Sequence, residues 1–338
     1  MEFIEYKKCL SFPGFGIEPF YVDRVAFTLF GKDVYWYGVL ITIGMILAVV
    51  CALWLAKHEK IKSDDIYDLA LWVIIIGVLG ARAYYVIFDW DPAVYVATGG
   101  TALQNIWGTF INCLAMWDGG LAIYGGVIAG LLTGFIFAKI KKIEFLKLFD
   151  ILAACVLIGQ IIGRWGNFIN IEVYGAETDA FTRMGIHLMN GDGHILAEYF
   201  VHPTFLYESV WNLIGLVIVL LTYKKKKFDG QVFCFYLVWY GFGRMILEGM
   251  RDPEYNLMIG NSGIMVSQLV GFISLVIGII LFCALFARCK KAKTESKEYT
   301  TIYGEQNSIS ETAEEAVEAE NKDTTDNTEL TETTPTEE

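Results

Sequence analysis

Residues 36–55 read WYGVLITIGMILAVVCALWL, and none of these positions carries a charged side chain. A run of about 20 apolar residues is long enough to cross the hydrocarbon core of a membrane as a helix. The chain has 338 residues, of which 55% are hydrophobic, and further runs of similar length follow. The sequence therefore predicts an all-α polytopic membrane protein with about seven spans, at about residues 35–56, 66–88, 118–138, 146–165, 206–223, 230–249 and 264–287.

Basic residues mark one side of this predicted bundle. They follow the first, third, fifth and seventh spans: Lys57, Lys60 and Lys62, then Lys139, Lys141, Lys142 and Lys147, then Lys224 to Lys227, then Arg288, Lys290, Lys291 and Lys293. Cytoplasmic loops of membrane proteins carry such an excess of lysine and arginine. We therefore expect the N-terminus outside and the C-terminus in the cytoplasm. That orientation requires an odd number of spans, in agreement with seven.

Three regions are expected along the chain. Residues 1–34 form an N-terminal segment outside, with no features of a cleaved signal peptide. Residues 35–288 form the seven-helix membrane domain. Within it, the polar segment at about 173–202 is expected to form a small outside lobe, and residues 89–117 an outside connection whose aromatic stretch lies along the membrane interface.

Residues 289–338 are expected to be a cytoplasmic acidic tail. From Thr294 onward it holds 14 Asp and Glu but 2 Lys, which accounts for the net charge of −12 of the whole chain. A segment with so much charge and so few aromatic residues predicts disorder. We expect the tail to have no catalytic role. Because the acidic residues belong to the tail, the net charge says nothing about the partners of the membrane domain. No nucleic-acid partner is expected.

The strongest polar cluster is GRWGNFINIEVYG at 163–175, which closes the fourth span on the outer side. It contains Arg164, Asn167, Asn170, Glu172 and Gly175. Polar groups at membrane depth must be paired or face a cavity. Two interpretations stay open. Arg164 extends to the interface and is held there by amides, or the cluster binds an anionic group, since a guanidinium grips phosphate through two parallel hydrogen bonds.

A second cluster is formed by Arg244, Glu248 and Arg251 on the sixth span. Spacings of four and three place all three on one helical face. An ion-pair ladder within one helix would explain them. However, Arg244 falls inside an otherwise apolar span, and an arginine at membrane depth is a candidate functional residue.

Glycines dominate the start of the third span, in WDGGLAIYGG at 117–126. Gly126, Gly130 and Gly134 recur every four residues, which is typical of a small-residue face for helix packing. The double glycines on either side of Tyr124 would let a lipid or a loop reach its hydroxyl group.

Four further candidates lie toward the same side. Tyr37 begins the first span, where an interface aromatic residue would also fit. Arg82 and Tyr85 lie near the outer end of the second span. His202 opens the segment HPTFLYE, in which a proline near the helix start and Glu208 in its first turn also fit helix capping.

These residues alone indicate an outward-facing polar cavity for an anionic lipid or solute. An enzyme, a transporter and a lipid-binding scaffold all fit. A transporter would be expected to show internal repeats and polar groups reaching both faces, and the sequence has no clear repeat. We expect no metal and no cofactor, because the 7 cysteines and 4 histidines have no metal-ligand spacing.

The string GRWGNFINIEVYG resembles the signature of the prolipoprotein diacylglyceryl transferase family, Gly-Arg-x-Gly-Asn-Phe-x-Asn-x-Glu followed by Gly three residues on. Other landmarks of the family follow in its order: WYG at 36–38, GAR at 80–82, the double-glycine segment at 119–126, HPTFLYES at 202–209 and the set Arg244, Glu248 and Arg251. The resemblance covers roughly residues 15–290.

The resemblance implies a specific reaction at the outer face of the bacterial cytoplasmic membrane. Such enzymes transfer the diacylglyceryl group of phosphatidylglycerol to the lipobox cysteine of a preprolipoprotein. A thioether forms and glycerol 1-phosphate leaves. The expected partners are therefore phosphatidylglycerol and the lipobox segment, and we expect the protein to act as a monomer.

The resemblance also implies roles. Arg164 matches the phosphate-binding arginine of the signature, Arg244 the second essential arginine, and Tyr37 the essential tyrosine of the first span. Nine further residues are expected to bind the substrate, some of them at the remaining conserved positions of the family: Asn167, Asn170, Glu172, Gly175, Glu248, Arg251, Arg82, Tyr85 and His202. Many members have histidine where this chain has Tyr124. Our hypothesis is that Arg164 and Arg244 stabilise the departing phosphate, that Glu172 and Glu248 orient them, and that Tyr124, Tyr37 or an ionised glutamate takes the thiol proton.

Overall fold

The structure is a computed structural model that describes residues 7–115, 119–190, 192, 194–252, 258 and 265–294. The helices are α1 (Trp36–Glu59), α2 (Ser63–Phe88), α3 (Pro92–Tyr95), α4 (Ala102–Leu114), α5 (Ile123–Lys141), α6 (Phe145–Asn170), α7 (Thr204–Thr222), α8 (Gln231–Leu247) and the helix Val266–Thr294. The 3-10 turns are η1 (Pro13–Phe15), η3 (Tyr223–Lys225) and η4 (Glu248–Met250). The strands are β1 (Lys7–Phe12), β2 (Ile17–Tyr21), β3 (Val25–Leu29), β4 (Lys32–Tyr35), β5 (Met184–Met189) and β6 (Ile195–Val201). The chain divides into two units, Met1–Phe282 and Cys283–Glu338, and α1–α8 with all six strands belong to the first.

Among the described residues, 6 helices are long and apolar enough to cross a membrane: Trp36–Glu59, Ser63–Phe88, Ile123–Lys141, Phe145–Asn170, Thr204–Lys225 and Val266–Thr294. They coincide with six of the expected spans and confirm a mostly helical, polytopic membrane protein. The remaining expected span, 230–249, coincides with α8, which has 17 residues and continues into η4. At 1.5 Å per residue, α8 alone is about 26 Å long, close to the hydrocarbon thickness of about 30 Å. The count of seven therefore stays a prediction.

Two of the expected segments extend beyond the residues that the structure describes. The third span was expected from residue 118, but α5 begins at Ile123, and Trp117 and Asp118 lie outside the described residues. At the other end of the chain, residues 289–294 are still helical. The rest of the expected acidic tail lies outside the described residues.

The prediction of an all-α protein was wrong in one respect, because the expected lobe is a β-sheet. Its 4 antiparallel strands have the order β2-β1-β5-β6. Strands β5 and β6 come from the expected lobe, but β1 and β2 come from the N-terminal segment. Cys9 in β1 pairs with His187 in β5. Because the pairing joins segments far apart in the sequence, local patterning gave no sign of it.

A small hydrophobic core fixes this sheet to the helices. Leu10 of β1, Ile186 of β5 and Val201 of β6 are buried together with Ile171, directly after α6, and Phe205, near the start of α7. The sheet therefore covers the end of the bundle where the signature segment leaves α6.

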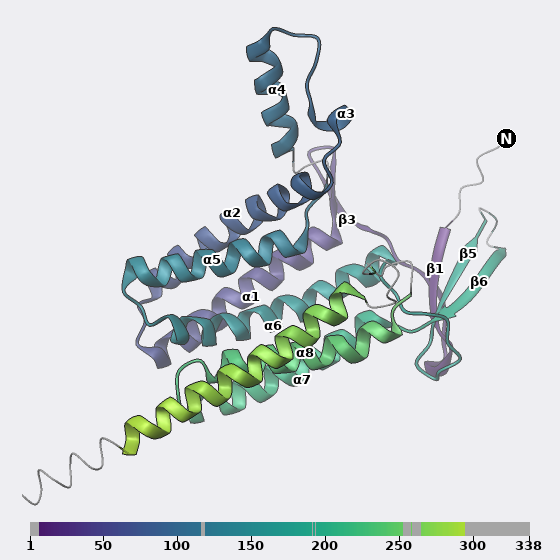
Figure 1. The fold of residues 1–338 in the computed structure, drawn as a ribbon. Helices are drawn as coiled ribbons and strands as arrows, with labels where there is room; N and C mark the ends of the chain where they lie inside the picture. Colours follow the sequence, from purple (N-terminus) through teal and green to yellow (C-terminus); the bar gives the residue numbers. More distant parts are fainter. Residues whose placement is uncertain are drawn as a thin grey trace, which may run out of the picture. The chain divides into compact units, whose positions relative to one another are not determined.

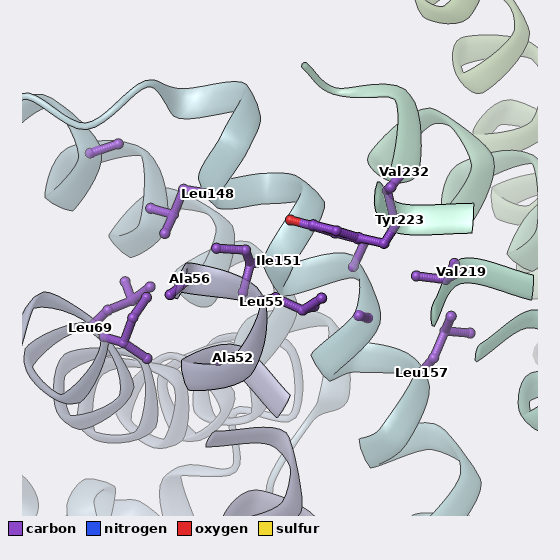
Figure 2. Packing of buried hydrophobic residues seen from close by; sticks show 14 of the residues in the cluster. Ala52, Leu55, Ala56, Leu69, Leu148, Ile151, Leu157, Val219, Tyr223 and Val232 are labelled. Carbon is purple, nitrogen blue, oxygen red and sulfur yellow. The ribbon is translucent and has the colours of Figure 1, made fainter. Parts of the chain in front are cut away.

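The main core lies toward the other end of α6. Helix α1 packs along α6, α2 along α5, and α7 along α6 (Figure 1). Leu55 of α1, Leu148 and Ile151 of α6 and Tyr223 after α7 meet there (Figure 2). Because lipid tails are as apolar as leucine, close van der Waals packing stabilises such a membrane core. Helix α6 thus has a tightly packed half, in which the carboxylate of Asp150 is buried and paired with Lys226. Its opposite end carries the signature segment.

Glycines bring α2 and α5 into close contact. A Cβ atom added at Gly125 would lie 2.3 Å from the carbonyl oxygen of Gly80, and one at Gly126 would lie 3.4 Å from that of Gly77. The small-residue packing face is confirmed, although Gly134 faces Phe149 of α6 instead. The double glycines were expected to leave space through which a lipid or loop could reach Tyr124. For Gly125 this was wrong, because the backbone of α2 fills the space beside it.

Helix α4 has no buried residue, and Leu103, Ile106, Trp107 and Phe110 are all exposed. An apolar, aromatic face of this kind suits the membrane–water interface. This agrees with the interfacial segment expected between residues 89 and 117, which stays a prediction.

Candidate active site

Three helices bring an ion-pair network together at the signature end of the bundle. Glu208 of α7 contacts Arg164 of α6 through its Oε2 at 2.7 Å from Nη2. The same oxygen lies 3.4 Å from Nη1 of Arg244 on α8. Its other oxygen, Oε1, accepts a hydrogen bond of 2.8 Å from Nη2 of Arg251. A single carboxylate therefore joins all three arginines.

Glu248, the first residue of η4, completes the network. Its two oxygens lie 2.9 Å from Nη1 of Arg244 and 3.1 Å from Nη1 of Arg251. The hydroxyl of Ser267 donates to it at 2.6 Å. The intrahelical ladder expected for Arg244, Glu248 and Arg251 is thus present, and Glu208 links that ladder to α6.

The network is buried and carries excess positive charge. Glu248 is 1% exposed, Glu208 5% and Arg251 8%. Among the described residues of the network, three arginines face two glutamates, which leaves one positive charge uncompensated. Nε of Arg244 is buried without a hydrogen-bond partner among the described residues. Charged groups at this depth demand a partner, so the arrangement suits an anionic ligand.

Glu208 is the residue that sequence reasoning missed. Helix capping was one of its two interpretations, but α7 begins at Thr204 and has no acidic residue in its first turn. Glu208 comes in the next turn and points into the network. A buried acid inside an apolar span, with unpaired arginines predicted on the same side, was the signal that could have identified it.

The signature segment continues past α6 in a strained turn. Ile171 and Val173 have φ angles of 53° and 55°, in the left-handed region that costs branched residues about 1–2 kcal/mol each. Between them, the backbone N–H of Glu172 donates to the carbonyl of Asn167 at 3.0 Å. The Glu172 side chain accepts a hydrogen bond of 3.2 Å from Asn170. The backbone carbonyl of Asn167, the amide of Asn170 and the carboxylate of Glu172 therefore help to hold the turn that follows Arg164.

Gly175 joins this turn to α7 and α8. Its N–H donates to the carbonyl of His202 at 2.9 Å, and it forms an isolated antiparallel bridge with Arg251. An added Cβ would lie 2.5 Å from Cβ of His202 and 2.6 Å from the carbonyl oxygen of Met250. Only glycine fits this crossing. The position is therefore part of what sets Arg251 beside Glu208.

Two tyrosines approach the network from other helices. The ring of Tyr37 lies against Gly166, where a Cβ would be 2.4 Å from its Cδ2, and its hydroxyl is close enough to interact with Arg164 and Glu172. Tyr124, at the start of α5, interacts electrostatically with Arg244. Both residues predicted to be catalytic besides the arginines therefore lie near the charged cluster.

Arg82 and Tyr85 have different surroundings. The Arg82 guanidinium donates at 2.8 Å to the carbonyls of Cys113 and Gly119, with longer bonds to Asn112 and Gly120. It also lies over the Tyr85 ring, 5.8 Å from its centre. Among its described contacts, Arg82 holds the end of α4 and the glycine turn to α2. Its role in substrate binding stays a prediction.

A small, partly open pocket lies between α6, α7 and α8. Its lining includes the charged residues Arg164, Glu208 and Arg244 and the neutral polar residues Gln160, Asn212 and Tyr240. The pocket therefore places neutral polar groups directly beside the arginines.

The fold and this site define a polytopic membrane protein with a buried, arginine-rich ion-pair network at one end of its helices. Residues 24–284 match the family described as prolipoprotein diacylglyceryl transferase. Relatives named phosphatidylglycerol–prolipoprotein diacylglyceryl transferase include that of Finegoldia magna, 43% identical over 77% of this chain and 94% of the relative. That of Clostridioides difficile is 42% identical over 81% and 100%, and that of Listeria innocua 40% over 80% and 92%. The chain belongs to the prolipoprotein diacylglyceryl transferase family.

Proposed function

We propose that this protein transfers the diacylglyceryl group of phosphatidylglycerol to the lipobox cysteine of a preprolipoprotein. In this reaction a carbon–sulfur bond forms at the glycerol carbon that carries the phosphate. The bond from that carbon to the phosphate oxygen breaks, and glycerol 1-phosphate leaves with its electron pair. The thiol proton passes to a base. The observation that carries the proposal is the excess positive charge of the network around Glu208, in a chain that belongs to this family.

Stabilisation of the leaving phosphate is the main task of the site. Forming a thiolate from a thiol of pKa about 8.5 costs about 2 kcal/mol at neutral pH. One well-placed donor to a developing oxyanion contributes about 3–4 kcal/mol. Two arginines therefore outweigh a base. Arg164 and Arg244 bind the phosphate oxygens, and Glu208 and Glu248 keep the two guanidinium groups in place. Glu172, whose described side-chain bond is to Asn170, holds the turn instead.

The thiol proton passes to an ionised glutamate of the site, or to a phenol oxygen that passes its own proton on to solvent. Tyr124 is the favoured group because it approaches Arg244 from a separate helix and is 37% exposed. Tyr37, packed on Gly166, is the second candidate. The reaction needs no cofactor and no metal, since the nucleophile and the leaving group both belong to the substrates.

The site lies toward the outer face of the cytoplasmic membrane. The lysine-rich segments lie at the ends of the helices opposite Arg164, and the positive-inside rule places them in the cytoplasm. With α8 as the seventh span, the N-terminal sheet lies outside and the C-terminal helix ends inside.

A transporter for an anionic lipid or solute is the alternative from another class. It would need polar groups that reach both ends of the helices. At the inner end of the bundle, Lys226 pairs with the buried carboxylates of Glu59 and Asp150, beside the apolar core around Leu55 and Ile151. Because these charges already pair with one another, they offer a solute no free polar site at that end, which favours the enzyme.

The test uses purified protein with labelled phosphatidylglycerol and a lipobox peptide. We expect a lipidated peptide, and we expect Arg164→Ala and Arg244→Ala each to lower the rate at least about 100-fold. Arg183→Ala is the matched control, because Arg183 lies in the sheet lobe and its described hydrogen bonds are to its own loop. Near-normal transfer by both site variants would refute the mechanism, and solute flux in proteoliposomes without lipid transfer would favour the transporter.

A further inference from the structure

The pocket beside the ion-pair network has a second, uncharged polar layer. Gln160, Asn212 and Tyr240 line the same pocket as the charged residues. Each lies four positions from one of them, on the same helix: Gln160 with Arg164, Asn212 with Glu208, and Tyr240 with Arg244. Because α7 runs antiparallel to α6 and α8, all three neutral residues lie on the same side of the charged layer. At 1.5 Å per residue, four positions place them about 6 Å farther into the bundle, slightly more than one helical turn.

Gln160 has an unsatisfied end. Its Nε2 donates to the hydroxyl of Tyr236 at 3.0 Å, while its Oε1 is buried without a partner among the described residues. If the amide is turned over, Tyr236 donates to the oxygen and the NH2 group becomes the free end. In either orientation one polar group of Gln160 has no described partner. Buried groups of this kind normally bond to something.

Asn212 is in a similar position. It is 7% exposed, and no described residue forms a hydrogen bond with its side-chain amide. It lies inside an apolar span, where an unpaired amide is costly. Two amides on facing helices, both lining one pocket, therefore point to a ligand with uncharged hydrogen-bonding groups at this depth.

We propose that Gln160 and Asn212 bind the ester carbonyls of the glycerolipid donor and so select a lipid with acyl chains. This inference rests on the proposed function. With the phosphate at the arginines, the ester groups lie a few bonds farther toward the chains, which is the depth of the amide layer. Ester carbonyls are uncharged acceptors, and amide N–H groups are matching donors. The charged layer recognises the head group, and the neutral layer recognises the linkage of the chains.

The experiment compares two lipid donors. One is phosphatidylglycerol with ester-linked chains, and the other is an analogue with the same chains in ether linkage. Both contain the same phosphate and the same carbon–oxygen bond that breaks. We expect the parent protein to prefer the ester donor in kcat/KM. Asn212→Leu and Gln160→Met should each lower the ester-to-ether ratio about 2- to 10-fold, the effect of losing one neutral hydrogen bond.

The ratio separates recognition from folding. A variant that folds poorly loses activity toward both donors equally, so its ratio stays that of the parent. Thr133→Val is the matched control. Thr133 is buried in α5, and its hydroxyl donates to Ala129 of the same helix at 2.7 Å. Its ratio should equal that of the parent.

Three results would overturn the inference. Equal rates for both donors in the parent would show that the linkage is not recognised. Parental ratios in both variants would show that these amides do not recognise it. In either case transfer still occurs, so the proposed function stands. No transfer from either donor by the parent would overturn the proposed function and this inference together.

Discussion

The carboxylate of Glu208 on α7 lies 2.7 Å from the guanidinium of Arg164 on α6, and the same side chain contacts Arg244 and Arg251. One acid therefore sets the relative positions of three cations that would otherwise repel one another. Removing one partner of a buried ion pair typically costs about 3–5 kcal/mol, because a charge remains buried without compensation. The anion site thus depends on a residue that needs no contact with the substrate.

Replacement of Glu208 tests this dependence. Glu208→Gln keeps the shape but removes the charge, so we expect a loss of at least about 3 kcal/mol in the free energy of unfolding and a large loss of transfer. Thermal unfolding in detergent and the lipobox-peptide assay measure the two effects. Glu177→Gln, at an exposed position of the lobe, should change neither. Parental stability and activity of Glu208→Gln would contradict the assigned role.

The phenol of Tyr124 is tested by Tyr124→Phe. If it takes the thiol proton, kcat falls by about 100-fold or more, in the range of general base catalysis. The KM for phosphatidylglycerol should change little, because the arginines still bind the phosphate. Tyr84→Phe is the control, since the Tyr84 ring lies beside that of Tyr124 at 6.4 Å. Unchanged activity of Tyr124→Phe would remove Tyr124 from this role and favour Tyr37.

Replacement of Gly175 tests the close contact between the chain at Gly175 and the segment Met250–Arg251. In Gly175→Ala the new Cβ would meet the backbone at Met250 and the side chain of His202, which we expect to cost about 1–3 kcal/mol. Gly159→Ala is the matched control, because nothing lies within 4 Å of that position in α6. Helix propensity should make the control neutral or more stable by up to about 1 kcal/mol. Equal stabilities of the two variants, measured by thermal unfolding, would contradict the claim that only glycine fits at position 175.

His202 gives a dependence on pH. Burial lowers the pKa of His202 below its ordinary value, so the folded state favours the neutral ring. Its contribution to stability is complete above the ordinary pKa of about 6.5 and is lost as pH falls from there to the lowered pKa. We expect the free energy of unfolding of His202→Gln to fall less than that of the parent between about pH 8 and about pH 5. His194→Gln, at an exposed position, should keep the parental slope.

Removal of the acidic tail should leave catalysis intact. The described part of the chain stops at Thr294, within a helix, so a truncation after Lys293 removes almost no described structure. The proposed orientation places this end in the cytoplasm, away from the substrates. We therefore expect the parental rate of transfer in membranes. A truncated protein that is inserted normally but inactive would refute the prediction.

Much of the membrane domain could be predicted because each span is a local property. The apolar run from Trp36 to Leu55 is long enough to cross a bilayer whatever surrounds it, and the same holds for five of the other spans. Arg164, Arg244 and Glu248 could be predicted as a site because charge inside an apolar run is unusual wherever it occurs. Arg82 was predicted as a site residue by the same signal. Its described hydrogen bonds are instead to backbone carbonyls of α4 and of the glycine turn.

The sequence by itself therefore determined which segments are helical and apolar, and which charged residues had to find partners. Only the tertiary structure decided what those partners are. Glu208 became the centre of the site because α6, α7 and α8 pack side by side with α7 antiparallel. Strand β1 entered a sheet with β5 because the two segments share a buried core with Ile171 and Phe205. Such pairings depend on distances in space between remote residues, and no local pattern encodes them.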